Sequence, residues 1–110
     1  MIPESFDYHR PSSVDEAIGL LSDDAKLLAG GHSLIPAMKL RLSSPGALVD
    51  IGQLAELNYI REDGGAIAIG AASTHHQIES SDIVQSKASA LAQAASVIGD
   101  PQVRNKGTIG

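Results

Sequence analysis

The sequence predicts an α+β fold in which a small mixed sheet is flanked by helices. Helical and extended patterns alternate along the chain, short turn signals separate them, and no internal repeat or low-complexity linker is present. Hydrophobic residues make up 43% of the 110 positions, which suffices for the core of one compact domain. Because only Phe6, Tyr8 and Tyr59 are aromatic, that core must be mainly aliphatic.

The amino-terminal half predicts a helix and two strands. In SSVDEAIGLLSDD, Ser13 is followed three residues later by Glu16, the pattern of a capping box, and four apolar residues share one helical face. These four are Val14, Ala17, Ile18 and Leu21. The run AKLLAGG is short, apolar and stopped by two glycines, so it predicts a buried strand entering a tight turn. After Pro45, GALVDI predicts a second strand of the same kind.

The carboxy-terminal half predicts a hairpin followed by two helices. LNYIRED and GGAIAIGAA are extended patterns joined through Asp63-Gly64-Gly65, a turn that favours pairing of the two strands. In STHHQIESSDIVQ, Thr74 is the expected cap of a short helix and Gln77 occupies its third position. The alanine-rich segment KASALAQAASVI, residues 87–98, predicts a second helix, which Gly99-Asp100-Pro101 ends.

The loop within LLAGGHSLIPAMKLRL, residues 27–42, has the composition of an anion site. With Ser33 as a helix cap, the following Leu-Ile-Pro forms the first turn and an apolar stripe faces the core. The stripe consists of Leu34, Ile35, Met38 and Leu42. Free N–H groups at the helix start carry partial positive charge, and Gly30-Gly31 lets a ligand approach the backbone. Since His32 and Ser33 add side-chain donors, the loop suits a phosphate.

The alternative is that the Gly-Gly turn only connects the strand to the helix and binds nothing, because glycines are common in such connections. The loop matches neither G-x-x-x-x-G-K-[ST] nor G-x-G-x-x-G, which argues against P-loop nucleotide triphosphatases and Rossmann proteins. The ending GTIG, residues 107–110, is a second turn of small residues that could meet the first across a ligand.

Composition argues against several classes of function. The net charge of −5 and the pI near 5.1 argue against binding to nucleic acid or an anionic membrane surface. The absence of cysteine excludes disulfides, thiolate metal sites and cysteine-bound iron–sulfur clusters in this chain. No segment approaches the ~20 apolar residues of a membrane span, and the first residues lack the pattern of a signal peptide, which predicts a cytoplasmic protein.

The remaining polar residues predict no chemistry of their own. The adjacent His75 and His76 point about 100° apart on a helix and cannot easily share one metal ion. Arg104 and Lys106 precede the second small-residue turn and could offer charge to a phosphate, but basic residues at a helix exit are ordinary surface features. We therefore expect no metal ligand in this chain, and no acid, base or nucleophile that acts on a substrate.

Over essentially its whole length the sequence resembles the flavin-binding medium subunits of molybdenum hydroxylases, especially those of aerobic carbon monoxide dehydrogenases. The resemblance lies in IPESFDYHRPSSVDEAIGLL, LAGGHSLIPAMKLRL, LVDIGQL, IGAASTHHQIESS and IGDPQVRNKGTIG. In that family, loops of the types A-G-G-H-S and T-I-G-G hold the FAD pyrophosphate. The resemblance assigns the first loop to Ala29, Gly30, Gly31, His32 and Ser33, the second to Thr108, Ile109 and Gly110, and a place beside the flavin to Ile98.

The resemblance implies that residues 1–110 form the amino-terminal half of a PCMH-type, vanillyl-alcohol-oxidase-like FAD-binding domain. Family members are much longer, so the sequence is expected to be an amino-terminal part that is cut inside the second loop. Such a part is expected to hold FAD weakly and to be inactive alone. It is also expected to associate with copies of itself through apolar surface that the missing part would cover.

For the intact assembly, the resemblance implies electron transfer through FAD. A large subunit with a molybdenum–pterin centre oxidises the substrate, and a small subunit with iron–sulfur clusters passes the electrons to FAD and an external acceptor. Two other classes remain open. One is a noncatalytic assembly domain that docks to partner subunits, and the other is the flavin subunit of another xanthine-oxidase-family enzyme or an aromatic-thioester reductase.

Overall fold

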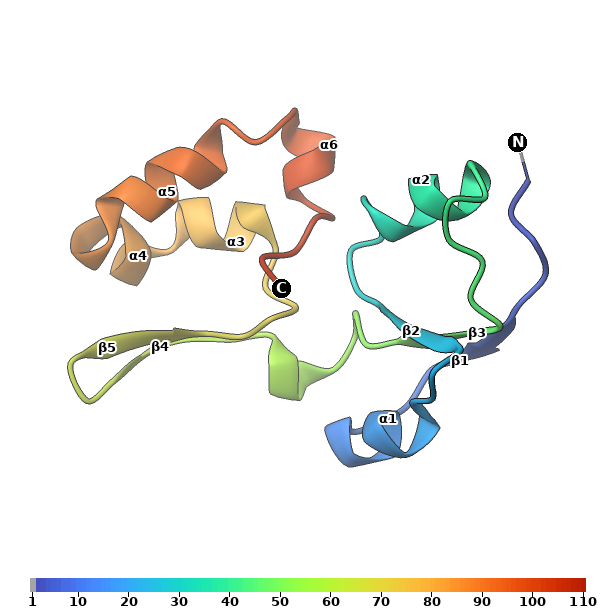
Figure 1. Cartoon of the computed structure of the whole chain (residues 1–110). Coiled ribbons are helices and arrows are strands. Elements are labelled where there is room, and N and C mark those ends of the chain that lie inside the picture. Colours follow the sequence, from blue (N-terminus) through green and yellow to red (C-terminus); the bar gives the residue numbers. More distant parts are fainter. Residues whose placement is uncertain (1) are drawn as a thin grey trace. The chain divides into compact units, whose positions relative to one another are not determined.

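The computed structural model describes residues 2–110, and the chain divides into two compact units, the first ending at Leu54 and the second beginning at Ala55 (Figure 1). The parallel strands belong to the first unit and the antiparallel strands to the second. The α+β class with small sheets and flanking helices is confirmed, and the two strand orientations lie in two separate sheets.

The first unit is built on a three-stranded parallel sheet in the order β1-β3-β2. Its strands are β1 (Asp7–His9), β2 (Ala25–Leu28) and β3 (Ala47–Asp50). The central strand β3 buries Leu48 and Val49, as its apolar sequence predicts. The edge strand β2 is less buried than we expected, and Leu27 is 48% exposed, because β2 has a neighbouring strand on one side only.

Helices α1 (Val14–Leu20) and α2 (Leu34–Lys39) lie on opposite faces of this sheet (Figure 1). The crossover from β1 to β2 and the return from β2 to β3 run in opposite directions across the sheet. Because parallel crossovers are nearly always right-handed, two such connections place their helices on opposite faces.

The cap of α1 agrees with its sequence pattern in one bond and differs in the other. The Ser13 hydroxyl accepts the Glu16 N–H at 3.1 Å, as expected for a helix cap. The Glu16 carboxylate, however, accepts hydrogen bonds from the N–H and hydroxyl of Ser12 instead of completing a capping box with Ser13. On the predicted apolar face, Ala17 is buried but Ile18 is 60% exposed, so the helix packs along a narrower line than expected.

Helix α2 is shorter than the predicted apolar stripe. Met38 is buried, but the helix ends at Lys39 and Leu42 lies beyond it, 79% exposed. The left-handed φ of 57° at Arg41 breaks the helical path. Ser33 precedes the helix but has helical backbone angles and forms no side-chain cap, so the predicted capping role of its hydroxyl is wrong.

The second unit begins with a 3₁₀ turn (Ala55–Leu57) and a two-stranded hairpin of β4 (Ile60–Asp63) and β5 (Ala66–Ile69). The predicted turn is confirmed, since Gly64 and Gly65 have φ values of 57° and 87°. A two-residue turn with positive φ at both positions matches the twist of the strands that it joins. One face of the hairpin contributes Ile60 and Ile69 to the core of this unit.

Four helices complete the second unit: α3 (His75–Ser80), α4 (Asp82–Lys87), α5 (Ser89–Ser96) and α6 (Pro101–Arg104). Their core consists of Ile78, Val84, Ala92 and Ala95. The segment predicted as one helix after Thr74 is divided, because Ser81 leaves the helical path and caps α4. The sequence reasoning also missed α6, which Asp100 caps through the Val103 N–H at 2.9 Å.

The capping box of α3 yields a stability prediction. Thr74 accepts the Gln77 N–H, and the Gln77 side chain accepts the Thr74 N–H at 2.8 Å. We expect Thr74→Ala to lower the free energy of unfolding by about 1 kcal/mol, measured by chemical denaturation. Ser33→Ala is the matched control, because its hydroxyl caps nothing, and should change stability by less than about 0.5 kcal/mol. Equal losses for the two variants would contradict the assignment of the caps.

Candidate functional site

The first predicted loop, Ala29–Ser33, leaves the sheet at the carboxyl end of β2. The carboxyl end of the parallel strand β3 lies at the same edge, which is where ligands bind in open parallel sheets. Gly31 has a φ of 83°, a conformation that favours glycine. Within the described residues, the backbone N–H groups of Gly31, His32 and Ser33 donate no hydrogen bond. The loop therefore offers several free donors to an anion.

Both polar side chains of this loop are exposed. His32 and Ser33 lie at the surface, and in the described part of the chain no hydrogen bond engages the Ser33 hydroxyl. The reason for glycine at position 31 differs in part from the expected one. A Cβ there would lie 2.7 Å from Cδ1 of Ile35, the end of a partly exposed side chain that can move, so the backbone angle is the main reason for glycine at this position.

Asp50 supports this edge of the sheet, a role that the sequence reasoning missed. One of its carboxylate oxygens accepts a hydrogen bond from the Tyr8 hydroxyl, and the other accepts the Gly52 N–H at 3.0 Å. A Cβ on Gly52 would lie 3.3 Å from the carbonyl oxygen of Ala29. The Asp50 turn thus packs against the start of the glycine loop. The available signal was an aspartate at the end of a strand, followed by glycine two residues later.

An apolar hollow lies beside the first loop, within the first unit. Its lining includes Phe6, Tyr8, Leu28, Ile35 and Met38. Leu28 precedes the loop and Ile35 follows it, so residues on both sides of the loop line this hollow.

The second predicted loop, Thr108–Gly110, pairs with a segment that precedes α3. The Ile109 N–H donates to the Ser73 carbonyl at 3.0 Å, and the Gly110 N–H donates to the Ala71 carbonyl at 2.9 Å. A Cβ on Gly110 would lie 2.5 Å from the Ala71 Cβ, so this glycine is required for close backbone packing. Only Thr108 keeps an uncommitted N–H in this loop among the residues described. Among the described residues, the first loop thus has at least three free backbone N–H groups, and the second loop has one.

Ile98 is half-buried and follows the carboxyl end of α5. Its carbonyl oxygen lies near Nη1 of Arg104, at 3.4 Å, and the Gly99 carbonyl accepts from the same Nη1 at 3.1 Å. Arg104 is not the ordinary surface cation that we expected, since its side chain is only 17% exposed. From its position in the sequence, Arg104 is a basic residue at a helix end, and only its tertiary contacts show that it is mostly buried.

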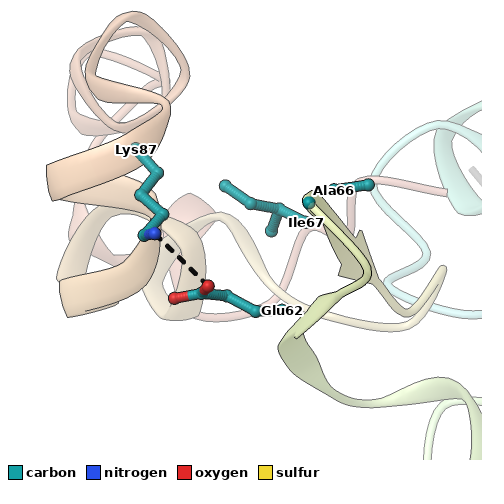
Figure 2. A pocket seen from close by; sticks show the side chains of 5 residues that line it. Glu62, Ala66, Ile67 and Lys87 are labelled. Atoms are coloured by element: carbon teal, nitrogen blue, oxygen red, sulfur yellow. Dashed lines mark ion pairs between the residues drawn. The ribbon is translucent and has the colours of Figure 1, made fainter.

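A second hollow, between the hairpin and α4, offers less to a ligand (Figure 2). Its lining includes Glu62, Ala66, Ile67 and Lys87, and the Lys87 Nζ lies 3.3 Å from the Glu62 Oε2. Both charged side chains are more than half exposed and face each other, so they satisfy one another instead of converging on a third group. Across residues 2–110, no group of three or more acidic, histidine or cysteine side chains could hold a metal ion.

A glycine loop with free N–H groups at the carboxyl edge of a parallel sheet, in an α+β protein, has the donors that an anion such as phosphate requires. The family described as FAD binding domain in molybdopterin dehydrogenase matches residues 4–110, and the chain belongs to that family. The predicted cofactor of the family, FAD, is thereby confirmed, whereas the individual contact residues remain a prediction.

Relatives with known names match the chain over its whole length. The carbon monoxide dehydrogenase medium chain of Hydrogenophaga pseudoflava is 55% identical, and the glyceraldehyde dehydrogenase medium chain of Sulfolobus acidocaldarius is 47% identical. Among solved structures, reconstituted CO dehydrogenase from Oligotropha carboxidovorans matches with a TM-score of 0.97 and 49% identity, over 100% of this chain.

The match covers only part of each relative. The chain spans 39% of the first of these medium chains and 40% of both the second and the solved chain. It therefore corresponds to their amino-terminal FAD-binding portion. Within residues 2–110, none of the helices has the length and hydropathy that a bilayer span requires.

The contact between Tyr8 and Asp50 predicts an altered titration. The hydrogen bond to Asp50, with desolvation and the negative charge of that carboxylate, raises the pKa of the Tyr8 phenol above its ordinary value. In a Tyr59→Phe background, where Tyr8 is the only tyrosine, we expect tyrosinate absorbance to rise at higher pH than in a model peptide. Asp50→Asn should lower this midpoint because it replaces the carboxylate that accepts the Tyr8 hydrogen bond with a neutral amide, and an unchanged midpoint would contradict the contact.

Proposed function

We propose that this chain supplies the amino-terminal part of an FAD-binding, electron-transferring subunit in a molybdenum-containing hydroxylase of the carbon monoxide dehydrogenase type. The observation that carries the proposal is the loop Ala29–Ser33, which presents free N–H groups at the carboxyl edge of a parallel sheet. This loop lies in a chain that is 55% identical to a carbon monoxide dehydrogenase medium chain.

The first loop supplies most of the pyrophosphate contacts in this proposal. The N–H groups of Gly31, His32 and Ser33 have no partner among the described residues and are available to phosphate oxygens. The exposed His32 and Ser33 side chains add donors. Ala29 and Gly30 bring the backbone from β2 to the ligand.

The second loop contributes fewer hydrogen-bond donors to the ligand than the first loop does. The N–H groups of Ile109 and Gly110 are bound to Ser73 and Ala71, so Thr108 is the residue whose N–H remains available. Its hydroxyl lies 3.5 Å from the Gly110 carbonyl, a distance at which that bond is weak and the hydroxyl can turn to a phosphate. Ile98 offers an apolar contact to the flavin side of the ligand.

When bound, FAD supplies the redox chemistry, and this chain supplies binding, orientation and electrostatics. We propose a molybdenum–pterin large subunit and an iron–sulfur small subunit as partners, since the relatives are named as medium chains. The absence of cysteine agrees with iron–sulfur clusters being held elsewhere. Relatives named for carbon monoxide and for glyceraldehyde share this portion of the chain, so we propose that another subunit selects the substrate.

The proposal predicts a difference in FAD affinity between the 110-residue chain and an extended chain. Extension adds the remaining portion of the Hydrogenophaga pseudoflava medium chain, which completes the length of the relative. We expect the extended chain to retain FAD through gel filtration and the 110-residue chain to bind it at least about tenfold more weakly. Both chains lose similar entropy when they bind FAD, but the shorter chain makes fewer contacts that offset this loss. Flavin fluorescence titration measures both. An extended chain that retains no FAD would disprove the proposal.

The glycine loop is tested in the extended chain by Gly31→Val. A side chain at φ 83° strains the backbone and displaces the free N–H groups, so we expect FAD affinity to fall more than about tenfold. Gly64→Val is the matched control, because it carries the same kind of strain in the hairpin turn and has open space around it. The control should lose stability but keep FAD, as judged by thermal unfolding and flavin content. Ser33→Ala should weaken FAD binding less than Gly31→Val does, because it removes only about one hydrogen bond to the ligand.

Equal loss of FAD from the Gly31→Val and Gly64→Val variants would show that instability alone releases the cofactor. Full retention by Gly31→Val with a normal melting curve would assign the loop a purely topological role.

A further inference from the structure

We infer that Arg104 is a positioning residue for the second loop, Thr108–Gly110, because its guanidinium ties α6 to α3 and to the turn that ends α5. Arg104 itself does not contact the ligand in this inference, and it acts through the backbone that follows it. The relevance to the cofactor rests on the proposed FAD-binding function, whereas the contacts of Arg104 stand on the structure.

The guanidinium has partners on two sides. Nη1 donates to the carbonyl of Gly99 at 3.1 Å and, more weakly, to that of Ile98 at 3.4 Å. Nε lies 3.3 Å from Oε1 of Glu79 on α3, and both side chains are mostly buried, at 17% and 21% exposure. Nε is itself buried and makes no aligned hydrogen bond, so its contact with Glu79 is an ion pair defined by distance.

Arginine is suited to this place because of its fixed planar fork. The Ile98 and Gly99 carbonyls lie in the turn that follows α5, beyond its C-cap, and their partial negative charge attracts a cation. A guanidinium can serve such carbonyls with one nitrogen and a carboxylate with another. A lysine ammonium carries the same charge but cannot span both sides with the same geometry.

The segment between Arg104 and the second loop is fixed at both ends. At one end, Arg104 is tied to Glu79 on α3. At the other end, Thr108 forms a bridge with Thr74, and the His75 N–H donates to the Gly107 carbonyl at 3.0 Å. Since Thr74 and His75 form the start of α3, both attachments are to one helix. The connection 105–107 therefore has little freedom, and Arg104 fixes the end from which this connection leads to Thr108.

Amide hydrogen exchange on the 110-residue chain tests the inference without a cofactor. In Arg104→Ala we expect the Ile109 and Gly110 amides, which donate to Ser73 and Ala71, to exchange about tenfold faster. Arg104→Lys should give an intermediate rate, since it restores only the charge. Arg61→Ala is the control, because Arg61 is an exposed cation of the same unit that stacks on Tyr59, and it should change neither amide.

Glu79→Gln keeps the test decisive if Arg104→Ala fails to fold. It removes the charge partner of Arg104 with little change of volume, and we expect faster exchange at Ile109 and Gly110 while the amides of α5 stay protected. Unchanged exchange at both amides in a folded Arg104→Ala or Glu79→Gln variant would overturn the inference.

The cofactor arm uses the chain extended with the remaining part of the Hydrogenophaga pseudoflava medium chain. We expect Arg104→Ala to weaken FAD binding about tenfold and Arg104→Lys to recover part of that loss. If Arg104→Ala binds FAD as tightly as the parent, the link from Arg104 to the cofactor is wrong while the proposed function stands. If the parent itself binds no FAD, the proposed function falls, and the exchange experiment decides the role of Arg104 in placing the loop.

Discussion

The parallel pairing of β3 with a strand on each side is the constraint on which the first unit depends. Because β3 is central, Leu48 and Val49 are buried and the strand is held along both edges. The same pairing brings the carboxyl ends of β2 and β3 to one edge. The glycine loop after β2 and the Asp50 turn after β3 thus become neighbours. The position of the glycine loop is therefore a consequence of strand order as much as of its own residues.

In the second unit, the charged residue Arg104 attaches helix α6, which the apolar core does not include. The core of Ile78, Val84, Ala92 and Ala95 fixes α3, α4 and α5, but it includes no residue of α6. The contacts of Arg104 with Glu79 and with the turn at Gly99 supply part of that attachment. A mostly buried guanidinium is costly to place, and its carbonyl and carboxylate partners offset the cost. This arrangement makes the position of the second loop depend on a few directional contacts.

Local sequence patterns predicted some elements well, because their causes are local. The turn at Gly64-Gly65 requires positive φ at both positions, and the Thr74 capping box involves residues only three apart. Ser33 has the right position for a cap, but its helical backbone angles turn the hydroxyl away from that role. The surface assignment of Arg104 failed for a different reason, since its partner Glu79 lies on another helix.

The sequence by itself determined the family, the α+β class, the central strand and the hairpin, and it predicted the first loop as an anion site. These follow from residue types over short spans, or from a collinear resemblance over the whole chain. Only the tertiary structure decided which backbone donors are free. The N–H groups of Gly31, His32 and Ser33 remain available, while those of Ile109 and Gly110 are bound to carbonyls far earlier in the chain. Local sequence does not specify such partners, because a backbone N–H is satisfied by whatever segment the fold brings beside it.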